Sequence, residues 1–491
     1  MSDGRKFWAA STAVLLCALI WLIVTLETER ATVERKSLQT PAGGVSLYLT
    51  NDPSQQPLVL IAHGFAGSAQ MMQTIARDLA RAGFTTATFD YIGHGRHPGA
   101  LSADVSDLNG TTAQLVEQSR HVLAELRAHI GAAVPLVLLG HSMATDIQIR
   151  AAQADGNVAA VVAISMYSDA ITPTFPERLL VLSGQWEDRL RAVGLEAVRQ
   201  IDADAGEGET VQAGNVLRRA TYVPRTEHVA VLYSRVALLE IRVWLAEATG
   251  LDPVGMPQSM GVQILAVLGL TVVTFVTGMR AFGPPPLKSG VAMSPKAFAF
   301  ALLLPAGIAS ATNFAASSAM GFAGFGALAL FLSVWGAVAL ALCLRASRRL
   351  GGISVVGLLV FLAVALGFAL ALDRYGAAFL PAGPRIRLFF LLLPGAFLFM
   401  LADRALLQYA PLWQRIMARA LPIAFLLALM LARPQVMGLL FTVLPVLILF
   451  HLVYSTLARS IADRFSVATA GVGAGICLAW ALSASTPLFA G

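Results

Sequence analysis

Apolar and polar residues are arranged differently along two parts of the chain. Over residues 45–250, short apolar runs alternate with amphipathic stretches, whereas beyond residue 261 long apolar runs are joined by short polar loops. Apolar runs of about four to eight residues predict buried strands, and runs of about 20 predict helices that can cross a bilayer. The pattern therefore predicts two structural classes within one chain.

The short apolar runs predict strands that alternate with helices. The candidate strands are 45–49, 57–63, 85–90, 135–140, 158–165, 178–184 and 221–224. Helix-like stretches lie between them at about 70–82, 112–130, 143–155, 189–200 and 229–249. Buried strands in alternation with helices indicate an α/β fold, with a mostly parallel sheet covered on both faces.

The first apolar run, residues 8–26, carries no charge and is long enough to span a bilayer as a helix. A signal peptide would have a shorter apolar core followed by a cleavage site with small residues. This run instead leads directly into Glu27, Glu29 and Arg30. We therefore expect a retained N-terminal transmembrane anchor over residues 1–27.

Further apolar runs predict a membrane domain of about eight helices. They are 261–279, 297–317, 322–344, 351–372, 387–402, 418–432, 436–457 and 467–489. The runs 387–402 and 418–432 are short and could be re-entrant instead. The expected organisation is an anchor over 1–27, an α/β domain over 28–258 and a multi-span α-helical membrane domain over 259–491.

Charge follows the same division. Residues 1–258 contain 20 Lys and Arg against 26 Asp and Glu, whereas residues 259–491 contain 15 Lys and Arg against 3 Asp. A basic chain can indicate a nucleic-acid partner, but here the excess lies in the hydrophobic half. Orientation in a membrane explains it better, so we expect no nucleic-acid partner. The sequence does not define an oligomeric state.

Basic residues also predict how the spans are oriented. If the N-terminus is cytoplasmic, the inner loops contain 13 Lys and Arg and the short outer loops contain four. Cytoplasmic loops carry such an excess. We therefore expect an integral, multi-pass membrane protein whose α/β domain, between the first and second spans, is extracytoplasmic, either periplasmic or external.

The clearest chemical signal lies at the end of the strand 135–140. Gly140-His141-Ser142-Met143-Ala144 follows this strand and precedes a helix-like stretch. A nucleophile elbow needs this context, with a serine on a strained strand-to-helix turn. The usual motif ends in Gly; here Ala144, also small, suits a place where helix and strand backbones come close.

Three further features follow strands in an informative order. His63-Gly64-Phe65 ends one strand, Gly184-Gln185-Trp186-Glu187-Asp188 follows another, and Glu227-His228-Val229 opens an amphipathic stretch. The resulting order along the chain is serine, acid, histidine. Among folds that carry a Ser-His-acid triad, this order is typical of one fold, and the other folds have different orders.

With these motifs, residues 45–250 resemble an α/β-hydrolase of the lysophospholipase and monoacylglycerol-lipase-like group. The similar stretches are IAHGFAGSAQMM (61–72), FDYIGHGRHPG (89–99), LLGHSMA (138–144), LSGQWED (182–188) and EHVAVLYS (227–234). The resemblance covers about two fifths of the chain and does not extend to the membrane half. It implies a Ser-His-acid hydrolase that acts on an ester, thioester or amide.

The resemblance also implies roles for individual residues. Ser142 would be the nucleophile and His228 its base. Glu187 would be the triad acid, because it comes three residues after Gly184, with Asp188 as the alternative. The backbone N–H groups of Phe65 and Met143 would form the oxyanion hole.

Other polar residues of this region predict less chemistry. Asp90, His94 and His97 could suggest a metal site, but no further ligand cluster supports one, so we expect neither metal nor cofactor. His141 is expected to pack beside the site.

Only the short connection 166–177 is left for a cap over the site. A membrane surface, or outer loops of the membrane domain, could therefore complete the site and present a lipid-like substrate.

The leading hypothesis is a membrane-anchored serine hydrolase that cleaves a small-molecule or lipid-like ester through an acyl-enzyme. An amide or peptide hydrolase of the same fold is the alternative within enzymes, because the triad cannot separate the two. A membrane transport or acyl-handling protein with a hydrolase-derived sensing domain is the alternative outside them.

Overall fold

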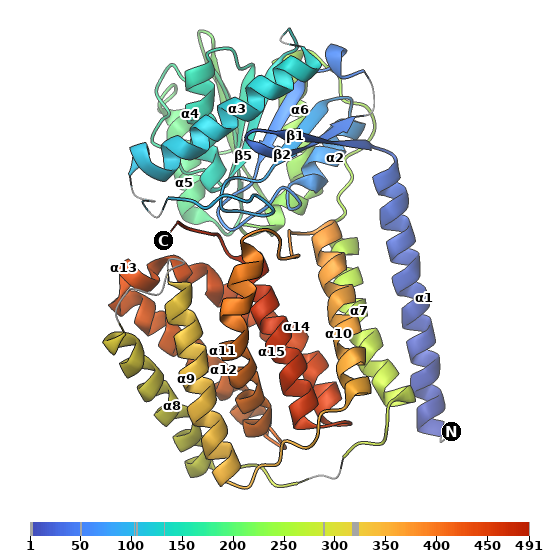
Figure 1. The fold of residues 1–491 in the computed structure, drawn as a ribbon. Helices are drawn as coiled ribbons and strands as arrows, with labels where there is room; N and C mark the ends of the chain where they lie inside the picture. Colours follow the sequence, from blue (N-terminus) through green and yellow to red (C-terminus); the bar gives the residue numbers. More distant parts are fainter. Residues whose placement is uncertain are drawn as a thin grey trace. The chain divides into compact units, whose positions relative to one another are not determined.

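The computed structural model describes residues 3–49, 52–102, 104, 107–131, 133–287, 290–316 and 324–490. The chain divides into two compact units (Figure 1). The α/β unit consists of Leu22–Leu265 and Arg374–Ala378, and the helical unit consists of Met1–Trp21, Ala266–Asp373 and Phe379–Gly491.

One sheet forms the centre of the α/β unit, and over the described residues it has nine strands in the order β1-β2-β4-β3-β5-β6-β7-β9-β8. The strands are β1 (Glu34–Thr40), β2 (Gly43–Leu49), β3 (Leu58–Ala62), β4 (Thr85–Phe89), β5 (Leu136–His141), β6 (Ala160–Ile164), β7 (Arg178–Gly184), β8 (Thr210–Ala213) and β9 (Val216–Val223). The six strands from β4 to β9 in this order pair in parallel, and β1, β2 and β8 pair antiparallel. The predicted mostly parallel α/β fold is confirmed.

Each predicted strand corresponds to an observed one, but two edge strands were missed. Six of the seven predicted strands correspond to β2–β7 and the seventh to β9. Strand β1 has the sequence ERKSLQT and strand β8 has TVQA, and both are largely exposed. Because an edge strand is held mainly by backbone hydrogen bonds to one neighbour, it does not need the apolar pattern on which strand prediction depends.

Helices cover both faces of the sheet. They are α2 (Gln73–Arg81), α3 (Ala113–Ile130), α4 (Met143–Asp155), α5 (Asp188–Arg199) and α6 (Arg235–Thr249). The predicted helix 229–249 is divided, since a short 3-10 turn, Ala230–Tyr233, precedes α6. Helix α6 begins after Ser234, whose hydroxyl accepts a hydrogen bond from the Val236 N–H and so caps the helix.

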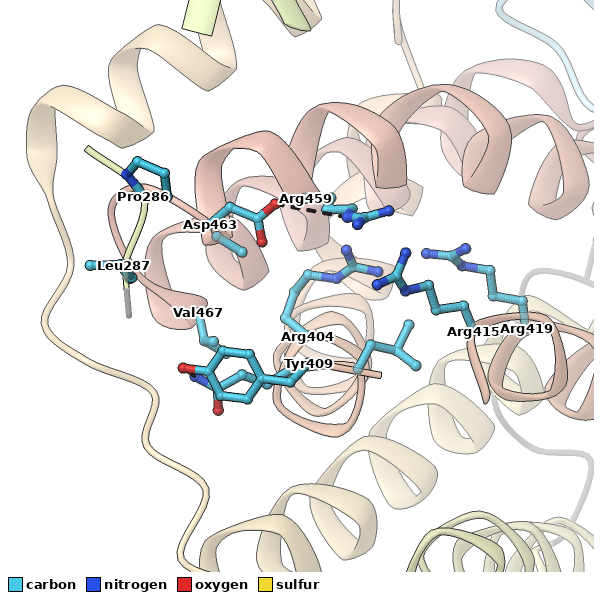
Figure 2. Close-up of a pocket in the computed structure, with 12 residues that line it drawn as sticks. Pro286, Leu287, Arg404, Tyr409, Arg415, Arg419, Arg459, Asp463 and Val467 are labelled. Atoms are coloured by element: carbon cyan, nitrogen blue, oxygen red, sulfur yellow. Dashed lines mark hydrogen bonds and ion pairs between the residues drawn. The ribbon is translucent and has the colours of Figure 1, made fainter. Parts of the chain in front are cut away.

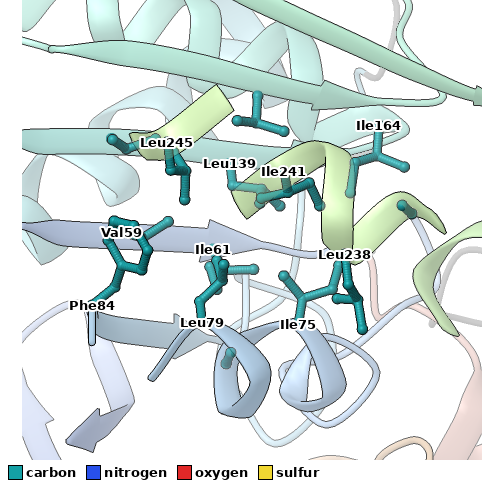
Figure 3. Packing of buried hydrophobic residues seen from close by; sticks show 14 of the residues in the cluster. Val59, Ile61, Ile75, Leu79, Phe84, Leu139, Ile164, Leu238, Ile241 and Leu245 are labelled. Carbon is teal, nitrogen blue, oxygen red and sulfur yellow. The ribbon is translucent and has the colours of Figure 1, made fainter. Parts of the chain in front are cut away.

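The main core lies between the sheet and the pair α2 and α6 (Figure 3). The labelled side chains that meet there are Val59, Ile61, Ile75, Leu79, Phe84, Leu139, Ile164, Leu238, Ile241 and Leu245. All ten are at most 1% exposed. Full burial of such a side chain stabilises a fold by about 1.5–3 kcal/mol. The central strands are therefore firmly held, and their carboxyl ends form a rigid base for the loops that follow.

The helical unit is built from long apolar helices and one helix of four residues. The helices are α1 (Asp3–Ala31), α7 (Gly261–Phe282), α8 (Pro295–Ala315), α9 (Phe325–Arg345), α10 (Val355–Tyr375), α11 (Arg385–Leu406), α12 (Leu412–Ala432), α13 (Pro434–Met437), α14 (Val443–Ala462) and α15 (Val467–Ser485), of which α1, α7 and α10 include residues of both units. In the described part of the chain, nine helices are long and apolar enough to cross a membrane, one near the N-terminus and eight after it. A long apolar helix near the N-terminus and a later group of long apolar helices are therefore present, as predicted.

The two apolar runs that looked short are parts of full-length helices. Helix α11 has 22 residues and α12 has 21, so each is long enough to span a bilayer. Both continue beyond the apolar run because charged residues occupy helical turns at their ends. At the end of α11, Arg404 Nε donates to Asp403 Oδ2 over 2.8 Å, which allows two charged residues to be buried in the helix.

Helix α15 is enclosed by its neighbours in the helical unit, whereas few residues in the spanning part of α1 are buried. Gly471 and Gly475 of α15 allow this packing. A Cβ atom on Gly471 would lie 2.9 Å from the Cα of Leu401, and one on Gly475 would lie 2.7 Å from the Cα of Phe397. Small residues let helix backbones approach in this way, so α11 and α15 form a close pair.

Candidate active site

The turn between β5 and α4 has a strained conformation. Ser142 has φ 54° and ψ −121°, and the helix begins at the next residue, Met143. A positive φ is uncommon for a residue with a side chain and is found at functional turns. The turn is tight, because a Cβ atom on Gly140 would lie 2.5 Å from the carbonyl oxygen of Ala144. Such a strand, strained turn and helix form the setting of a nucleophile elbow.

Three side chains from different loops meet at this turn. The Ser142 Oγ lies 2.9 Å from His228 Nε2, and His228 Nδ1 lies 2.6 Å from Glu187 Oε1. They follow the carboxyl ends of β5, β9 and β7, which end at the same edge because these strands are parallel. With Nδ1–H donated to the carboxylate, Nε2 is free to accept the Ser142 proton.

Glu187 is fixed by more than His228. Its other oxygen, Oε2, accepts hydrogen bonds from the Gly184 N–H at 2.6 Å and from the Ser165 hydroxyl at 2.7 Å. Burial raises the pKa of Glu187, but the hydrogen bonds from His228, Gly184 and Ser165 outweigh it and hold the pKa below its ordinary value. The carboxylate is therefore ionised at neutral pH.

The structure brings Glu187 to His228 and leaves Asp188 outside. The side chain of Asp188 is 92% exposed and forms an ion pair with Arg191 at 3.3 Å, whereas that of Glu187 is 7% exposed. Ser165, which the sequence analysis did not single out, has a φ of 54° directly after β6. Its position at the end of a predicted strand was the only signal for it.

The predicted oxyanion residues flank the serine. Gly64, which precedes Phe65, passes so close that a Cβ atom on it would lie 2.9 Å from the Cβ of Ser142. Met143 is the first residue of α4, and N–H groups in the first turn of a helix have no carbonyl partner within that helix. The residue before Phe65 thus passes close to the Ser142 side chain, and Met143 follows Ser142 directly in the chain.

Buried His63 supports the loop that carries Phe65. Its Nε2 accepts a hydrogen bond from the Tyr91 N–H at 3.1 Å, so its Nδ1 donates to the Gly64 carbonyl at 2.8 Å. Burial lowers the pKa of His63, which keeps the ring neutral. The sequence placed His63 at the end of a strand but gave no sign of this support.

Asp90 ties together the loops after β3 and β4. Its carboxylate accepts hydrogen bonds from the backbone N–H of Ala69 at 2.7 Å and of Arg96 at 3.0 Å. Across the described residues, no group of three or more His, Cys, Asp or Glu side chains is placed to hold a metal ion. Asp90 therefore acts here on the backbone of its neighbours.

His141 packs against His228, as expected from its place beside the elbow. The centroids of the two rings are 4.8 Å apart, and His141 Nε2 donates to the His228 carbonyl over 2.8 Å. Burial, followed by the nearby His228, lowers the pKa of His141 to about 4. A neutral His141 therefore fixes the backbone that carries His228.

The cap over the site is minimal, as predicted. The connection 165–177 between β6 and β7 contains no helix, and all of its residues are described. Buried Arg218 holds it by donating to the carbonyl oxygens of Thr172 and Phe175 and to that of Ala197 at 2.7 Å. Asp146 adds a hydrogen bond from the Ser168 hydroxyl, so side chains from more than one element anchor the connection.

A segment from late in the chain completes the α/β unit. The Ala378 N–H donates to the Ser68 hydroxyl over 3.0 Å, three residues after Phe65. Glu27 accepts hydrogen bonds from Arg374 at 2.6 Å and from the Tyr375 hydroxyl at 2.7 Å. Residues 374–378 thus contact both the end of α1 and the loop that follows Phe65.

A comparison with protein families supports this fold over part of the chain. A family described as serine aminopeptidase, S33, matches residues 53–192. No curated protein matches the sequence.

Several solved structures are similar to about half of the chain. A Thermus thermophilus protein is 20% identical, with 43% of this chain and 98% of that chain covered and a TM-score of 0.32. A bacterial membrane phospholipase A, described as a virulence factor, is 15% identical. The match covers 50% of this chain and 96% of that protein, with a TM-score of 0.33. A dienelactone hydrolase from Anabaena variabilis is 18% identical. The match covers 44% of this chain and 96% of that protein, with a TM-score of 0.32.

Similarity at this level carries no information about substrate. The family match includes β3 to β7 and the elbow at Ser142, and the sheet order and the strained turn are those of an α/β hydrolase. The α/β unit therefore has the fold of an α/β hydrolase, and it is joined in one chain to a region of apolar helices.

Proposed function

We propose that the protein is a membrane-anchored serine hydrolase that cleaves an ester, with Ser142, His228 and Glu187 as its catalytic triad. The observation that carries the proposal is the unbroken chain of hydrogen bonds from Glu187 through His228 to Ser142, at a serine with φ 54°. A base within hydrogen-bond reach of a serine hydroxyl, itself oriented by a carboxylate, is the arrangement that activates this weak nucleophile.

The geometry supports a two-step reaction. Ser142 Oγ attacks the carbonyl carbon of the substrate while His228 Nε2 takes its proton, and the Phe65 and Met143 N–H groups stabilise the oxyanion. The imidazolium of His228, held by Glu187, then returns the proton to the leaving alcohol as the acyl-enzyme forms. A water molecule, deprotonated by His228, attacks the acyl-enzyme and releases the acid and the free serine.

An ester with a lipid-like acyl or alkyl part is the substrate class that we favour. The cap is short, and two aromatic side chains on loops at the same sheet edge, Tyr167 and Trp186, are 63% and 66% exposed. Exposed aromatic side chains suit contact with an apolar substrate or a membrane surface. The long apolar helices of the same chain would keep the domain close to such a surface.

An extracytoplasmic position of the α/β-hydrolase domain is part of the proposal. With nine spans and a cytoplasmic N-terminus, the basic residues concentrate in the inner loops, as they do in cytoplasmic loops. The same topology puts the loop with residues 374–378 on the outer side. This side is also that of the α/β unit, to which these residues belong. Accessibility of cysteines introduced at Ser54 and Arg348 to a membrane-impermeant maleimide in intact cells would test it. Labelling at position 54 alone is expected.

Amide hydrolysis is the second candidate, because the matching family is described as serine aminopeptidase. The triad serves both reactions, and only the leaving group differs. A panel of p-nitrophenyl esters of increasing chain length and of amino-acid p-nitroanilides, tested on the full chain in detergent, would separate the two. We expect a higher kcat/KM on the esters, and a preference for the anilides would make the aminopeptidase function the better assignment.

A fluorophosphonate probe tests the proposal most directly. The full-length protein should be labelled covalently, and Ser142→Ala should lose labelling together with about 10⁴-fold or more of esterase activity. Ser37→Ala, on the exposed edge strand β1, is a matched control that should behave like the wild type. An unlabelled wild type, or equal labelling of Ser142→Ala, would favour a sensing domain without hydrolase activity.

A further inference from the structure

A second group of charged side chains lies in the helical unit, where a cavity of about 280 Å³ opens between helix ends. Its walls come from the end of α11, the start of α12, the end of α14, the start of α15 and the residues after α7. Figure 2 shows the guanidinium groups of Arg404, Arg415, Arg419 and Arg459 gathered at this cavity. The cavity can hold several water molecules, each of which occupies about 30 Å³ in the liquid.

Two of the four arginines are explained by their own surroundings. Arg404 lies in the last turn of α11 and pairs with buried Asp403. Arg459 lies in the last turn of α14, 3.8 Å from the carboxylate of Asp463. A cation at a helix C-terminus also interacts favourably with the helix dipole. These two residues would be stable without any ligand.

Arg415 and Arg419 are attracted only at longer range by Asp463 and Asp403, which already pair with Arg459 and Arg404. Within the described part of the chain neither forms an ion pair or a side-chain hydrogen bond, and the Nε of Arg419 is buried without a partner. Arg415 lies in the first turn of α12, where the helix dipole disfavours a cation. The two are four residues apart on one helix, where like charges repel each other. Their arrangement is therefore unfavourable in the empty cavity.

Membrane orientation alone does not require this arrangement. The rule for cytoplasmic loops depends on the number of basic residues and not on where their side chains point. Here the side chains come from three helices and point to one space (Figure 2). An anion in that space would remove the repulsion and satisfy the free guanidinium donors.

We propose that this cavity binds a phosphate group, with Arg415 and Arg419 as its main ligands and Arg404 and Arg459 beside them. The planar guanidinium fork matches phosphate oxygens in pairs, so arginine is the residue suited to this anion. Basic cavities between membrane helices on the cytoplasmic side bind phosphorylated lipid head groups. The phosphate can therefore belong to an anionic phospholipid or to a free phosphate ion, and the two sources share the same chemistry.

The test uses the full-length protein purified in a neutral detergent and followed by its apparent unfolding temperature. One series adds mixed micelles with phosphatidylglycerol, compared with phosphatidylcholine, and the other adds sodium phosphate, compared with sodium chloride at equal ionic strength. We expect phosphatidylglycerol or phosphate to raise the unfolding temperature by about 4 °C over its control. A response to phosphatidylglycerol alone identifies a lipid head group, and a response to phosphate alone identifies a soluble ligand.

Variants connect the response to the cavity. The double variant Arg415→Gln/Arg419→Gln should lose the response, whereas Arg387→Gln, exposed in the first turn of α11, should keep it. Arg415→Lys/Arg419→Lys keeps the charge that orients the spans but lacks the planar fork, so its half-saturating ligand concentration should rise about 10-fold. This variant keeps the test decisive if the glutamine variant does not fold. No response in the wild type, or an unchanged response in either double variant, would overturn the proposal.

Discussion

Charged side chains at the two candidate sites differ in how many hydrogen-bond partners they have. In the α/β unit, Glu187 has three hydrogen-bond donors, and His228 is held on both ring nitrogens. In the helical unit, four arginines line one cavity, and two of them have no partner among the described residues. The first arrangement is complete without a ligand, and the second is not.

The difference indicates what each site is built to do. A reaction that proceeds by proton transfer needs groups already oriented in the free enzyme, because reorientation would add to the barrier. A binding site can leave donors unsatisfied, because the ligand supplies the missing partner. Four sets of variants test this difference between the two sites, and the largest expected effect comes first.

The largest effect is expected when the triad loses its carboxylate, Glu187. Glu187→Gln should lower kcat by about 10³-fold to 10⁴-fold, because the amide cannot stabilise the imidazolium of His228 or select its tautomer. Asp188→Asn is the matched control, and its activity should stay within about twofold of wild type because its side chain is exposed. Steady-state hydrolysis of a p-nitrophenyl ester measures both. If Asp188→Asn were the more damaged variant, Asp188 would be the acid.

A large loss of stability is expected when the buried ion pair of the helical unit is broken. Asp403→Asn leaves Arg404 buried without its carboxylate and should cost about 3 kcal/mol. Asp463→Asn breaks an exposed pair and should cost less than about 1 kcal/mol. Apparent unfolding temperatures of the full-length proteins provide the measurement. Equal shifts in the two variants would show that burial does not determine the value of these pairs.

His141 should make the α/β unit sensitive to acid. Its pKa is about 4 in the folded protein and 6.5 in the ordinary case, so the unfolded chain binds the proton first as the pH falls. The unfolding free energy should therefore decrease between pH 6.5 and pH 4, by about 2 kcal/mol at pH 5. His141→Gln can still donate to the His228 carbonyl but does not titrate. Urea unfolding at pH 7 and pH 5 should show a smaller pH dependence for this variant, and an unchanged one would mean that His141 is not the titrating group.

The smallest effect is expected from the arginine cavity without a ligand. In phosphate-free detergent, Arg415→Gln should raise the unfolding temperature by about 1 °C, because it removes the repulsion from Arg419. In phosphatidylglycerol micelles or in phosphate, whichever stabilises the wild type, Arg415→Gln should instead unfold at a lower temperature than the wild type. Arg387→Gln controls for the loss of one positive charge. A loss of stability in both conditions would mean that Arg415 has a structural partner.

Much of the fold could be predicted from local pattern. Strands β2–β7 and β9 are buried, so their apolar runs stand out, and the spanning helices are apolar for the same reason. Strands β1 and β8 escaped prediction because they are exposed at the edges of the sheet. Helices α11 and α12 are longer than their apolar runs because charged turns extend them.

The candidate site shows the same limit. Ser142 could be predicted because it lies on a turn between a strand and a helix. His228 could be predicted because it follows the serine and the acid in the chain order of a known triad. The choice between Glu187 and Asp188 depends on which side chain points inward, and adjacent residues do not differ in local pattern. Ser165, His63 and His141 support the site through contacts that no motif describes.

Local patterns of residues were enough to predict that buried strands alternate with helices, that a serine follows one of those strands on a turn, and that long apolar helices come after them. These are properties of neighbouring residues, and burial imposes them locally. The packing of distant elements brings Ser142 to a histidine 86 residues away and gathers arginines from three helices at one cavity. Such meetings depend on how distant elements pack, and hydrophobic periodicity carries no information about that.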